Sequence, residues 1–501
     1  MGKSFDIGLE RLTGAGLPSA SEGVPYIEAS RGDAAAAGGT FYLETFGCQM
    51  NEHDSEKVAG VLLARGYKQV ETPEAAKVIL YNTCSIREKA AQKVFSRLGE
   101  LRPFEGQLAA AKGLEGDTRL NPRKVVNAGG GKIIGVLGCV AQQEGQEIFE
   151  RAPWVSLVCG SASYRKLPQL IAELEAGNRR VTGLDIDTDE TFETEITRRD
   201  NPFRAYLTII EGCDKACSYC VVPFTRGPER SRASASILQE VRQLADMGYT
   251  EIQLLGQTVN SYADPSARKM RFSDLLVATA EIPGIRRVRF TTSHPRDFGK
   301  DIVDAIEDYP AICEHVHLPV QSGSPAVLRA MARTYTREEY LEKIALMKSA
   351  KRSVSITTDI IVGFPGETEG DFQETLSLMD GVQYDGAFCF KYSPRPNTPS
   401  LRMIDAIPEE EKSRRLAILL ELQREIQRSR NEKLVGDLLE VLVDGKSKRE
   451  NQWSGHTSSN RVVNFSSHAE NILGDYVQVK VTGATPNSLI GEALTGTGAQ
   501  P

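Results

Sequence analysis

The sequence predicts an α/β protein in three parts: an N-terminal parallel-sheet α/β domain, a central partial (βα)6 barrel and a small C-terminal antiparallel β-barrel. Strand-like and helix-like segments alternate over residues 40–180 and again over residues 201–408, which is typical of parallel sheets. After Gly436 the helical segments stop and short alternating strands follow one another, which favours a small antiparallel barrel.

The same patterns set the expected domain boundaries. Residues 1–39 contain glycine- and alanine-rich runs with few periodic apolar positions, so we predict a disordered leader. The acidic, threonine-rich stretch 184–200 is predicted to be a linker, and residues 103–131 a surface insertion. The folded parts are expected at residues 40–180 (N-terminal domain), 201–432 (central core) and 433–496 (C-terminal domain).

Composition limits the classes of protein that the chain can represent. It has 501 residues and 40% hydrophobic content, which is enough for several domain cores. Nine cysteines spread over this length favour a reducing compartment with metal or redox use. Neither a signal-peptide core nor a run of about 18 apolar residues is present. We therefore expect a cytoplasmic protein that does not associate with membranes.

The net charge of -7 argues against a generally basic nucleic-acid-binding surface, because phosphate binding normally requires a positive footprint. It does not exclude RNA, since a large protein can carry a local basic groove. Lys446, Lys448, Arg449 and Arg461 could supply one, although a short charge run is more often a solvated face.

Three cysteines follow successive strands of the N-terminal domain. We expect strands at 41–46, 77–83, 132–138 and 154–158, and helices at 51–66, 87–101 and 142–151. The first three strands end at or next to Cys48, Cys84 and Cys139. Because the carboxyl ends of parallel strands meet at one edge of a sheet, these cysteines would come together as a cluster site requires. A single cysteine at one of these positions would more often be a buried core residue than a cluster ligand.

Cys159 follows the fourth predicted strand. We expect it to be structural, although its place at a strand end could bring it near the other three cysteines.

The central domain opens with three closely spaced cysteines. Cys213, Cys217 and Cys220 stand in a C-x3-C-x2-C spacing after a predicted strand at 204–210. Thiolates this close in sequence can converge on one metal centre, whereas a disulfide would leave the third unpaired. A four-iron cluster held by three cysteines leaves one iron without a protein ligand, where a substrate or cofactor can bind.

Structural zinc is the alternative to an iron-sulfur cluster at these three cysteines. Zinc sites of this kind use four protein ligands at short, paired spacings. The nearest upstream cysteine is Cys159 and the nearest downstream histidine is His294, both too distant in sequence for such a spacing. The pattern therefore favours the cluster.

The remaining predicted strands complete the two barrels. Those of the central barrel are expected at 251–255, 287–291, 315–318, 353–361 and 386–391, followed by a helix at 409–433 whose apolar stripe packs on the barrel. Those of the C-terminal barrel are expected at 438–443, 461–464, 476–481 and 488–493. Barrel enzymes work at the carboxyl ends of their strands, and polar or glycine-rich turns follow the central strands.

The cysteine spacing with Tyr219 before Cys220 resembles the radical S-adenosylmethionine superfamily. The following segment, VVPFTRGPERSR over 221–232, resembles the methylthiotransferases within this superfamily. The motif GCQMN over 47–51 is similar to the one in the methylthiotransferases that modify isopentenyl-adenosine in tRNA. The resemblance covers residues from about 40 to 495, nearly the whole chain.

The resemblance implies two 4Fe-4S clusters and S-adenosyl-L-methionine as cofactors. One cluster would be held by Cys213, Cys217 and Cys220 and an auxiliary one by Cys48, Cys84 and Cys139. Similar strand-end turns contact the S-adenosylmethionine in the superfamily, which suggests a set of cofactor-binding residues. These are Gln257, Asn260, Ser293 and Gln321. The sequence does not identify a catalytic residue.

The implied reaction adds a methylthio group to carbon 2 of isopentenyl-adenosine beside the anticodon of tRNA. In the family, sulfur associated with the auxiliary cluster is methylated by one S-adenosylmethionine and transferred to a carbon radical formed with a second. The target must lie in an unpaired loop, because A-form RNA hides its base edges. A tRNA anticodon stem-loop is therefore the expected partner.

The C-terminal domain is similar to the TRAM module, an OB-like RNA-binding barrel. The expected RNA contacts are Arg461, Asn464 and the run 447–449. The electron donor and the proteins that supply sulfur or clusters are not identified by the sequence, and we expect a monomer.

The sequence is also compatible with other functions. Related methylthiotransferases act on threonylcarbamoyl-adenosine in tRNA or on an aspartate of a ribosomal protein, and the choice depends on pocket details. A metal-stabilised, non-catalytic RNA-binding protein belongs to another class and would contain zinc, or clusters without effect on S-adenosylmethionine.

Overall fold

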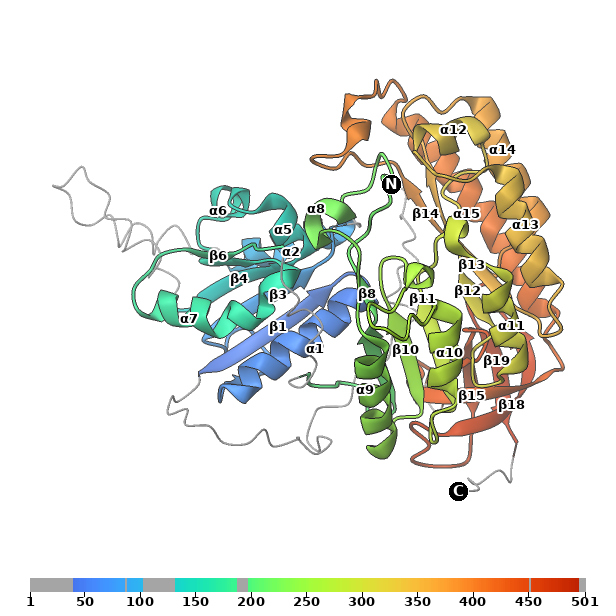
Figure 1. Ribbon diagram of the computed structural model, residues 1–501, viewed down its shortest axis with the longest axis horizontal. Coiled ribbons are helices and arrows are strands. Elements are labelled where there is room, and N and C mark those ends of the chain that lie inside the picture. Colours follow the sequence, from blue (N-terminus) through green and yellow to red (C-terminus); the bar gives the residue numbers. More distant parts are fainter. Residues whose placement is uncertain (1–38, 86–87, 102–130, 187–196, 450–451, 495–501) are drawn as a thin grey trace.

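The computed structural model describes residues 39–85, 88–101, 131–186, 197–449 and 452–494. Nearly all of the expected leader, the expected insertion and most of the expected linker lie outside these ranges. The described residues form the three predicted parts: a parallel-sheet domain, a partial barrel and a closed C-terminal barrel (Figure 1). The predicted fold class is confirmed.

The N-terminal domain is a six-stranded parallel sheet in the order β2-β1-β3-β4-β5-β6. Helices cover both faces, because successive strand residues point to opposite sides: Leu80 packs with the α1 and α7 side and Tyr81 with the α2 and α6 side. Its elements are β1 Thr40–Phe46, α1 Gln49–Ala64, β2 Lys68–Gln69, β3 Val78–Thr83, α2 Glu88–Glu100, β4 Ile133–Gly138, α5 Cys139–Glu144, α6 Glu147–Arg151, β5 Leu157–Cys159, η3 Ser161–Lys166, α7 Leu167–Glu175 and β6 Val181–Gly183.

Three details of this domain differ from the expectation. The helix expected at 142–151 is two helices, because α5 starts at Cys139 and the chain breaks at Gly145 with φ of 52°. The strand expected at 154–158 begins at Leu157, because residues 152–155 form a turn in which the Val155 N–H donates to the Ala152 carbonyl at 3.0 Å. The short edge strand β6 extends the sheet past residue 180.

The central domain has the six predicted parallel strands, arranged as two three-stranded sheets, β11-β10-β7 and β12-β13-β14. The sheets approach each other at a bridge between Val288 and Ile312. In the part of the chain that the structure describes, no ladder joins β7 to β14, so the barrel is open on that side. The strands are β7 Arg204–Thr208, β10 Glu251–Leu255, β11 Arg287–Thr291, β12 His315–His317, β13 Ser355–Val362 and β14 Gly386–Lys391.

Short elements and helices surround these strands. They are β8 Ile210–Glu211, α8 Val222–Arg226, β9 Arg230–Ser231, α9 Ser234–Asp246, η5 Val259–Ser261, α10 Phe272–Ala280, η6 Pro295–Asp297, α11 Lys300–Asp308, α12 Pro325–Ala330, α13 Arg337–Lys348, α14 Glu369–Val382, η7 Pro399–Arg402 and α15 Glu409–Glu432.

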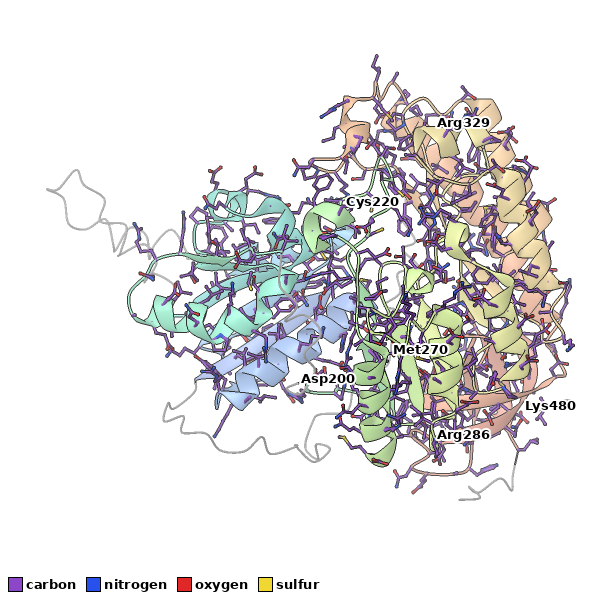
Figure 2. All side chains as sticks on the ribbon, in the orientation of Figure 1. Asp200, Cys220, Met270, Arg286, Arg329 and Lys480 are labelled. Atoms are coloured by element: carbon purple, nitrogen blue, oxygen red, sulfur yellow. The ribbon has the colours of Figure 1, made fainter. Side chains whose placement is uncertain are left out.

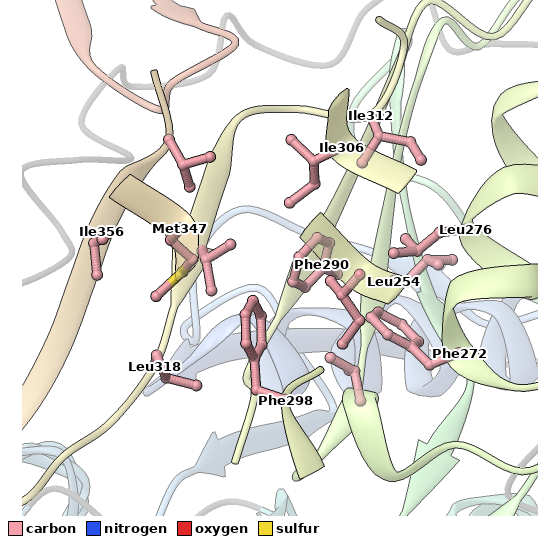
Figure 3. Packing of buried hydrophobic residues seen from close by; sticks show 14 of the residues in the cluster. Leu254, Phe272, Leu276, Phe290, Phe298, Ile306, Ile312, Leu318, Met347 and Ile356 are labelled. Atoms are coloured by element: carbon pink, nitrogen blue, oxygen red, sulfur yellow. The ribbon is translucent and has the colours of Figure 1, made fainter. Parts of the chain in front are cut away.

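One continuous apolar core joins the two halves of the partial barrel. Figure 3 shows Leu254 and Phe290 of the first sheet in the same cluster as Leu318, which follows β12, and Ile356 of β13. Phe272 of α10 meets Phe290 edge to face, with ring centroids 5.2 Å apart. The halves are therefore held together by side-chain packing where strand pairing is nearly absent.

The C-terminal domain is a closed barrel in the order β15-β16-β17-β19-β18, with antiparallel pairs except for the parallel pair β17–β19. Strand β16 was not predicted, because its inward positions are Trp453, Gly455 and Thr457 rather than aliphatic residues. A Cβ on Gly455 would lie 2.2 Å from the Leu442 carbonyl oxygen. The strands are β15 Leu438–Lys446, β16 Gln452–Thr457, β17 Val462–Ser466, β18 Tyr476–Ala484 and β19 Leu489–Ala493.

Buried ion pairs dock the C-terminal barrel on the amino ends of β7, β10 and β11. Glu251 accepts from Arg204 at 2.6 Å and from Arg289 at 3.0 Å. Arg204 also reaches Asp444 of β15 at 2.6 Å, and Arg289 donates to the Thr457 carbonyl at 2.6 Å. The C-terminal barrel therefore covers the end of the central barrel that lies opposite its carboxyl-end loops.

We expect Glu251→Gln to destabilise the apoprotein by about 3–5 kcal/mol near neutral pH, because the buried Arg289 loses its carboxylate and the partly buried Arg204 keeps only Asp444. Burial raises the pKa of Glu251, but Arg289 and Arg204 outweigh it and lower the pKa to about 2. A carboxylate with a depressed pKa stabilises the fold above its unfolded-state pKa and loses this effect as the pH falls through the folded-state value. The gap between the two proteins should therefore shrink below about pH 4.5, measured as urea midpoints.

Glu440→Gln is the matched control, because Glu440 pairs with Arg286 and Arg287 at the same interface but its side chain is 39% exposed, whereas that of Glu251 is fully buried. Its loss should cost less than about 1 kcal/mol. Equal destabilisation by both substitutions would contradict a special role for the buried carboxylate.

Candidate functional site

Cys213, Cys217 and Cys220 lie in the loop between β8 and α8. They are called the radical-site triplet here, after the cluster that the sequence predicts for them. Figure 2 shows Cys220 where the N-terminal domain meets the barrel. The loop is fixed at its start by Gly212, whose φ is 79° and on which a Cβ would lie 1.9 Å from the Pro228 carbonyl oxygen. A side chain there would be both strained and blocked. The Gly212 turn thus determines where the triplet begins.

The second half of the barrel holds the other side of the loop. Arg333 donates to Cys217 Sγ at 3.3 Å. The Ser218 hydroxyl donates to the Ala330 carbonyl at 2.8 Å, and the ring of Tyr219 meets Phe364 edge to face. The triplet therefore lies between the two halves of the barrel and depends on both.

The chemistry of this donor set fits a metal cluster. Burial raises the pKa of the Cys220 thiol to about 12, and it also raises the pKa of Cys213. A thiolate, the form that binds metal, is therefore costly here without a cation nearby. Iron bound at the loop would supply that charge.

The strand-end triplet, Cys48, Cys84 and Cys139, occupies the carboxyl edge of the N-terminal sheet as expected. Thr83 pairs with Phe46 on one side and with Gly138 on the other, so Cys84 and Cys139 each follow directly on neighbouring strands. Cys48 caps the start of α1, and Cys139 begins α5.

Close backbone contacts fix this edge. A Cβ on Gly47 would lie 2.5 Å from Cys84 Cβ, and one on Gly138 would lie 2.3 Å from Asn82 Oδ1. The amide of Asn82 in turn bonds to the Asn51 carbonyl at 2.9 Å and to Ser55. Buried amides thus support the loops that carry the cysteines, in the way that hydrogen-bonding groups behind metal ligands hold those ligands in position.

Cys159 lies at the next strand end but is packed in the apolar core on the α1 and α7 side of the sheet. Its thiol contacts the Gly160 carbonyl, and burial raises its pKa. These surroundings agree with the structural role expected for it.

The two triplets belong to different domains that meet at α5 and α8. Arg226, the last residue of α8, donates from Nε to Cys139 Sγ at 3.3 Å. Its other nitrogens donate to Glu211 at 2.7 Å and to Asp54 at 2.5 Å. The helix that follows the radical-site triplet therefore contacts a member of the strand-end triplet directly.

Within the described ranges, no three histidine, cysteine or carboxylate side chains converge as the ligands of one metal ion. In a four-iron cluster each cysteine binds a different iron, so the sulfurs spread farther apart than around one zinc ion.

The four residues expected to bind S-adenosylmethionine all follow the carboxyl ends of barrel strands. Gln257 accepts from the Gly212 N–H at 2.7 Å and so links β10 to the cysteine loop. The amide of Asn260 bonds both to the His294 N–H (2.7 Å) and to its carbonyl (2.8 Å), which places Asn260 beside Ser293. Gln321 has a positive φ of 75° and pairs with β13.

Ser293 stands out among these four. Its side chain is buried, and its hydroxyl has no hydrogen-bond partner within the described structure. The Thr208 and Thr292 hydroxyls, which are also at strand ends, share this property. Buried polar groups normally have partners, so this end of the barrel fits a polar cofactor.

Arg333, Lys215 and Arg226 are not among the site residues predicted from the sequence. Arg333 follows α12, far from the cysteine motif, and Lys215 within the motif binds Asp297 at 2.9 Å and Ser261 at 3.0 Å. Arg226 was part of the quoted family motif, but its contact with Cys139 crosses domains. The only sequence feature that could have pointed to Lys215 and Arg226 is their position close to the cysteine motif. The sequence alone does not show which groups they bind.

Comparison with known proteins agrees with the three-part architecture. Residues 207–379 match the radical SAM superfamily, residues 40–160 match the uncharacterized protein family UPF0004, and residues 432–494 match the TRAM domain. A structure of the radical S-adenosylmethionine methyltransferase TsrM from Kitasatospora setae, with cobalamin and a [4Fe-4S] cluster bound, aligns at a TM-score of 0.49 and 15% identity over 72% of this chain and 74% of that chain.

Relatives of nearly full length carry one shared name. Proteins from Solibacter usitatus and Koribacter versatilis are 61% and 60% identical to this chain, over 92% and 91% of it and over 99% and 98% of their own lengths. A protein from Aquifex aeolicus is 42% identical over 91% of this chain and 98% of its own. The chain therefore belongs to the family of these relatives, the tRNA-2-methylthio-N(6)-dimethylallyladenosine synthases.

Proposed function

We propose that this protein is a radical S-adenosylmethionine methylthiotransferase that adds a methylthio group to carbon 2 of isopentenyl-adenosine beside the anticodon of tRNA. The observation that carries the proposal is the contact between α5 and α8, which brings a strand-end cysteine next to the helix that follows the radical-site triplet. Family membership supports the choice of reaction and substrate.

We assign one 4Fe-4S cluster to the radical-site triplet, Cys213, Cys217 and Cys220, and a second to the strand-end triplet, Cys48, Cys84 and Cys139. When bound, the first cluster would supply the electron for reductive cleavage of S-adenosylmethionine, with methionine as the leaving group, and the second would supply the sulfur. Gln257, Asn260, Ser293 and Gln321 are proposed to surround the S-adenosylmethionine.

The protein's own groups position and shelter the reaction. The Gly212 turn and its bond to Gln257 set the start of the radical-site loop, and Arg333 orients Cys217. Tyr219 and the fully buried Phe364 exclude water from the side of the loop facing the second half-barrel. Such placement supplies proximity, while the cofactors supply the difficult chemistry.

The proposed partner is the anticodon stem-loop of tRNA, and the C-terminal barrel is the proposed RNA-binding module. Of the expected contacts, Lys448 and Arg449 are exposed. Arg461 instead binds Asp385 and Asn431 of the central domain, and Asn464 accepts from Ser447 at 3.0 Å. Arg461 therefore serves docking of the C-terminal barrel in this structure.

Among the described residues, no helix combines the length and apolarity needed to cross a bilayer. We propose that the protein acts as a monomer in the cytoplasm, with an electron donor and sulfur-supplying proteins still to be identified.

Anaerobic turnover tests the proposed reaction. Cluster-loaded protein, S-adenosylmethionine, a strong reductant and an isopentenyl-adenosine stem-loop should yield methylthio product and 5'-deoxyadenosine, both measured by mass spectrometry. Cys217→Ala should reduce both to background. Cys84→Ala should abolish the methylthio product and retain 5'-deoxyadenosine, because the radical-site triplet stays intact.

Cys313→Ala is the control, since Cys313 is a buried cysteine that belongs to neither triplet; it should keep both products. If 5'-deoxyadenosine formed while the nucleoside stayed unmodified, the proposed substrate would be wrong, and stem-loops with threonylcarbamoyl-adenosine or a ribosomal-protein aspartate would be tested next. Zinc in place of iron would refute the enzyme assignment.

Substitution of Ser293 tests the proposed S-adenosylmethionine site. A buried hydroxyl without a partner costs stability, so Ser293→Ala should leave the melting temperature of the cofactor-free protein unchanged or raise it. Loss of one neutral hydrogen bond to the cofactor should weaken S-adenosylmethionine binding by about two- to tenfold, measured by equilibrium dialysis.

Ser322→Ala gives the matched comparison. Ser322 is equally buried, but its hydroxyl bonds to Thr375 and accepts from the Ser324 N–H. This variant should lower the melting temperature and leave the affinity unchanged. Unchanged affinity in Ser293→Ala would remove Ser293 from the site.

A further inference from the structure

Arg226 lies at the junction of the two domains, and each of its three guanidinium nitrogens donates a hydrogen bond. Nη1 donates to Glu211 at 2.7 Å, Nη2 to Asp54 at 2.5 Å and Nε to Cys139 Sγ at 3.3 Å. The side chain is 3% exposed. Its partners come from β8, from α1 and from α5, so one residue joins the start of the radical-site loop to the edge that carries the strand-end triplet.

The two carboxylates fix the direction of the Nε–H group. A guanidinium is planar and presents its donors in a rigid fork, so binding both Nη atoms to Asp54 and Glu211 determines where Nε points. It points at the sulfur of Cys139. A lysine could supply a similar charge, but a single ammonium could not satisfy three partners in these separate directions.

This placement has a consequence for a cluster bound at Cys139. Hydrogen bonds to ligand sulfurs, net charge and burial set the reduction potentials of iron-sulfur clusters. Arginine stays protonated in proteins, and its charge is weakly screened when buried. Because reduction adds negative charge, a positive donor at a ligand sulfur favours the reduced state.

We propose that Arg226 is a positioning residue for the strand-end triplet: its N–H···S bond to Cys139 raises the reduction potential of the cluster held there and fixes that cluster relative to the radical-site loop. The inference rests on the proposed function, since it requires a cluster at Cys48, Cys84 and Cys139. It goes beyond that function by giving the chemical role of a residue that touches neither S-adenosylmethionine nor RNA in the proposal.

The full chain with Cys213, Cys217 and Cys220 replaced by alanine isolates the strand-end cluster. In this background we expect Arg226→Gln to make the midpoint potential of the cluster more negative. At a fixed applied potential the ratio of reduced to oxidised cluster should fall about tenfold, which corresponds to about 59 mV for one electron. Arg226→Lys should recover part of the shift, because the ammonium keeps the charge. Spectroelectrochemical titration followed by EPR measures all three proteins.

Arg232→Gln is the matched control. Arg232 lies on the same segment, is 4% exposed and pairs with Glu240 at 2.5 Å and with Ser236. It should lower thermal stability as Arg226→Gln does, while the midpoint potential stays at the parent value. A purely structural role for Arg226 would make the two substitutions indistinguishable, and equal potentials in all variants would overturn the proposal.

A measurement without substitution at Arg226 covers the case in which Arg226→Gln does not fold. In the triple-alanine protein grown with 15N-labelled arginine, pulsed EPR of the reduced cluster should detect a nitrogen coupling from the N–H···S contact. An assembled cluster without that coupling would overturn the role of Arg226 alone. If the triple-alanine protein binds no iron while Cys84→Ala does, the strand-end cluster itself fails, and this role for Arg226 fails with it.

Discussion

Buried charges at the junction of the N-terminal domain and the barrel set the geometry of the whole candidate site. Arg226 binds Asp54 of α1 and Glu211 of β8, and Arg199 binds Glu56 of α1 and Glu240 of α9. Removing such charges from water is tolerated only when partners satisfy them closely, and removing one partner is strongly destabilising. The domains are therefore held in one relative position, and the approach of the two cysteine triplets depends on it.

The two ends of the central barrel have different roles: one carries the candidate site and the other binds the C-terminal barrel. The carboxyl end of the central barrel carries the radical-site triplet and the unpartnered hydroxyls, while the amino ends of β7, β10 and β11 receive the C-terminal barrel through Arg204, Glu251 and Arg289. A five-residue strand such as β10 spans about 17 Å. An RNA that contacts both the C-terminal barrel and the site must therefore extend along the side of the central barrel.

Much of the fold could be predicted because it is encoded by local patterns. Strands β10, β11 and β14 begin and end at the predicted residues, and α15 ends one residue before its predicted end. The errors have physical causes that are not visible in a short window. Strand β16 turns a tryptophan, a glycine and a threonine inward, and Gly145 divides one expected helix by adopting a positive φ.

The sequence by itself determined the two cysteine triplets and the end of the sheet or barrel at which each lies, because spacing is a property of the chain and parallel strands share their direction. Only the tertiary structure decided which charged residues serve them. Arg226 and Arg333 reach cysteines 87 and 116 positions away, and Arg461 is used for docking. Such pairings depend on which buried charges meet when separate elements pack, and no local pattern records that choice.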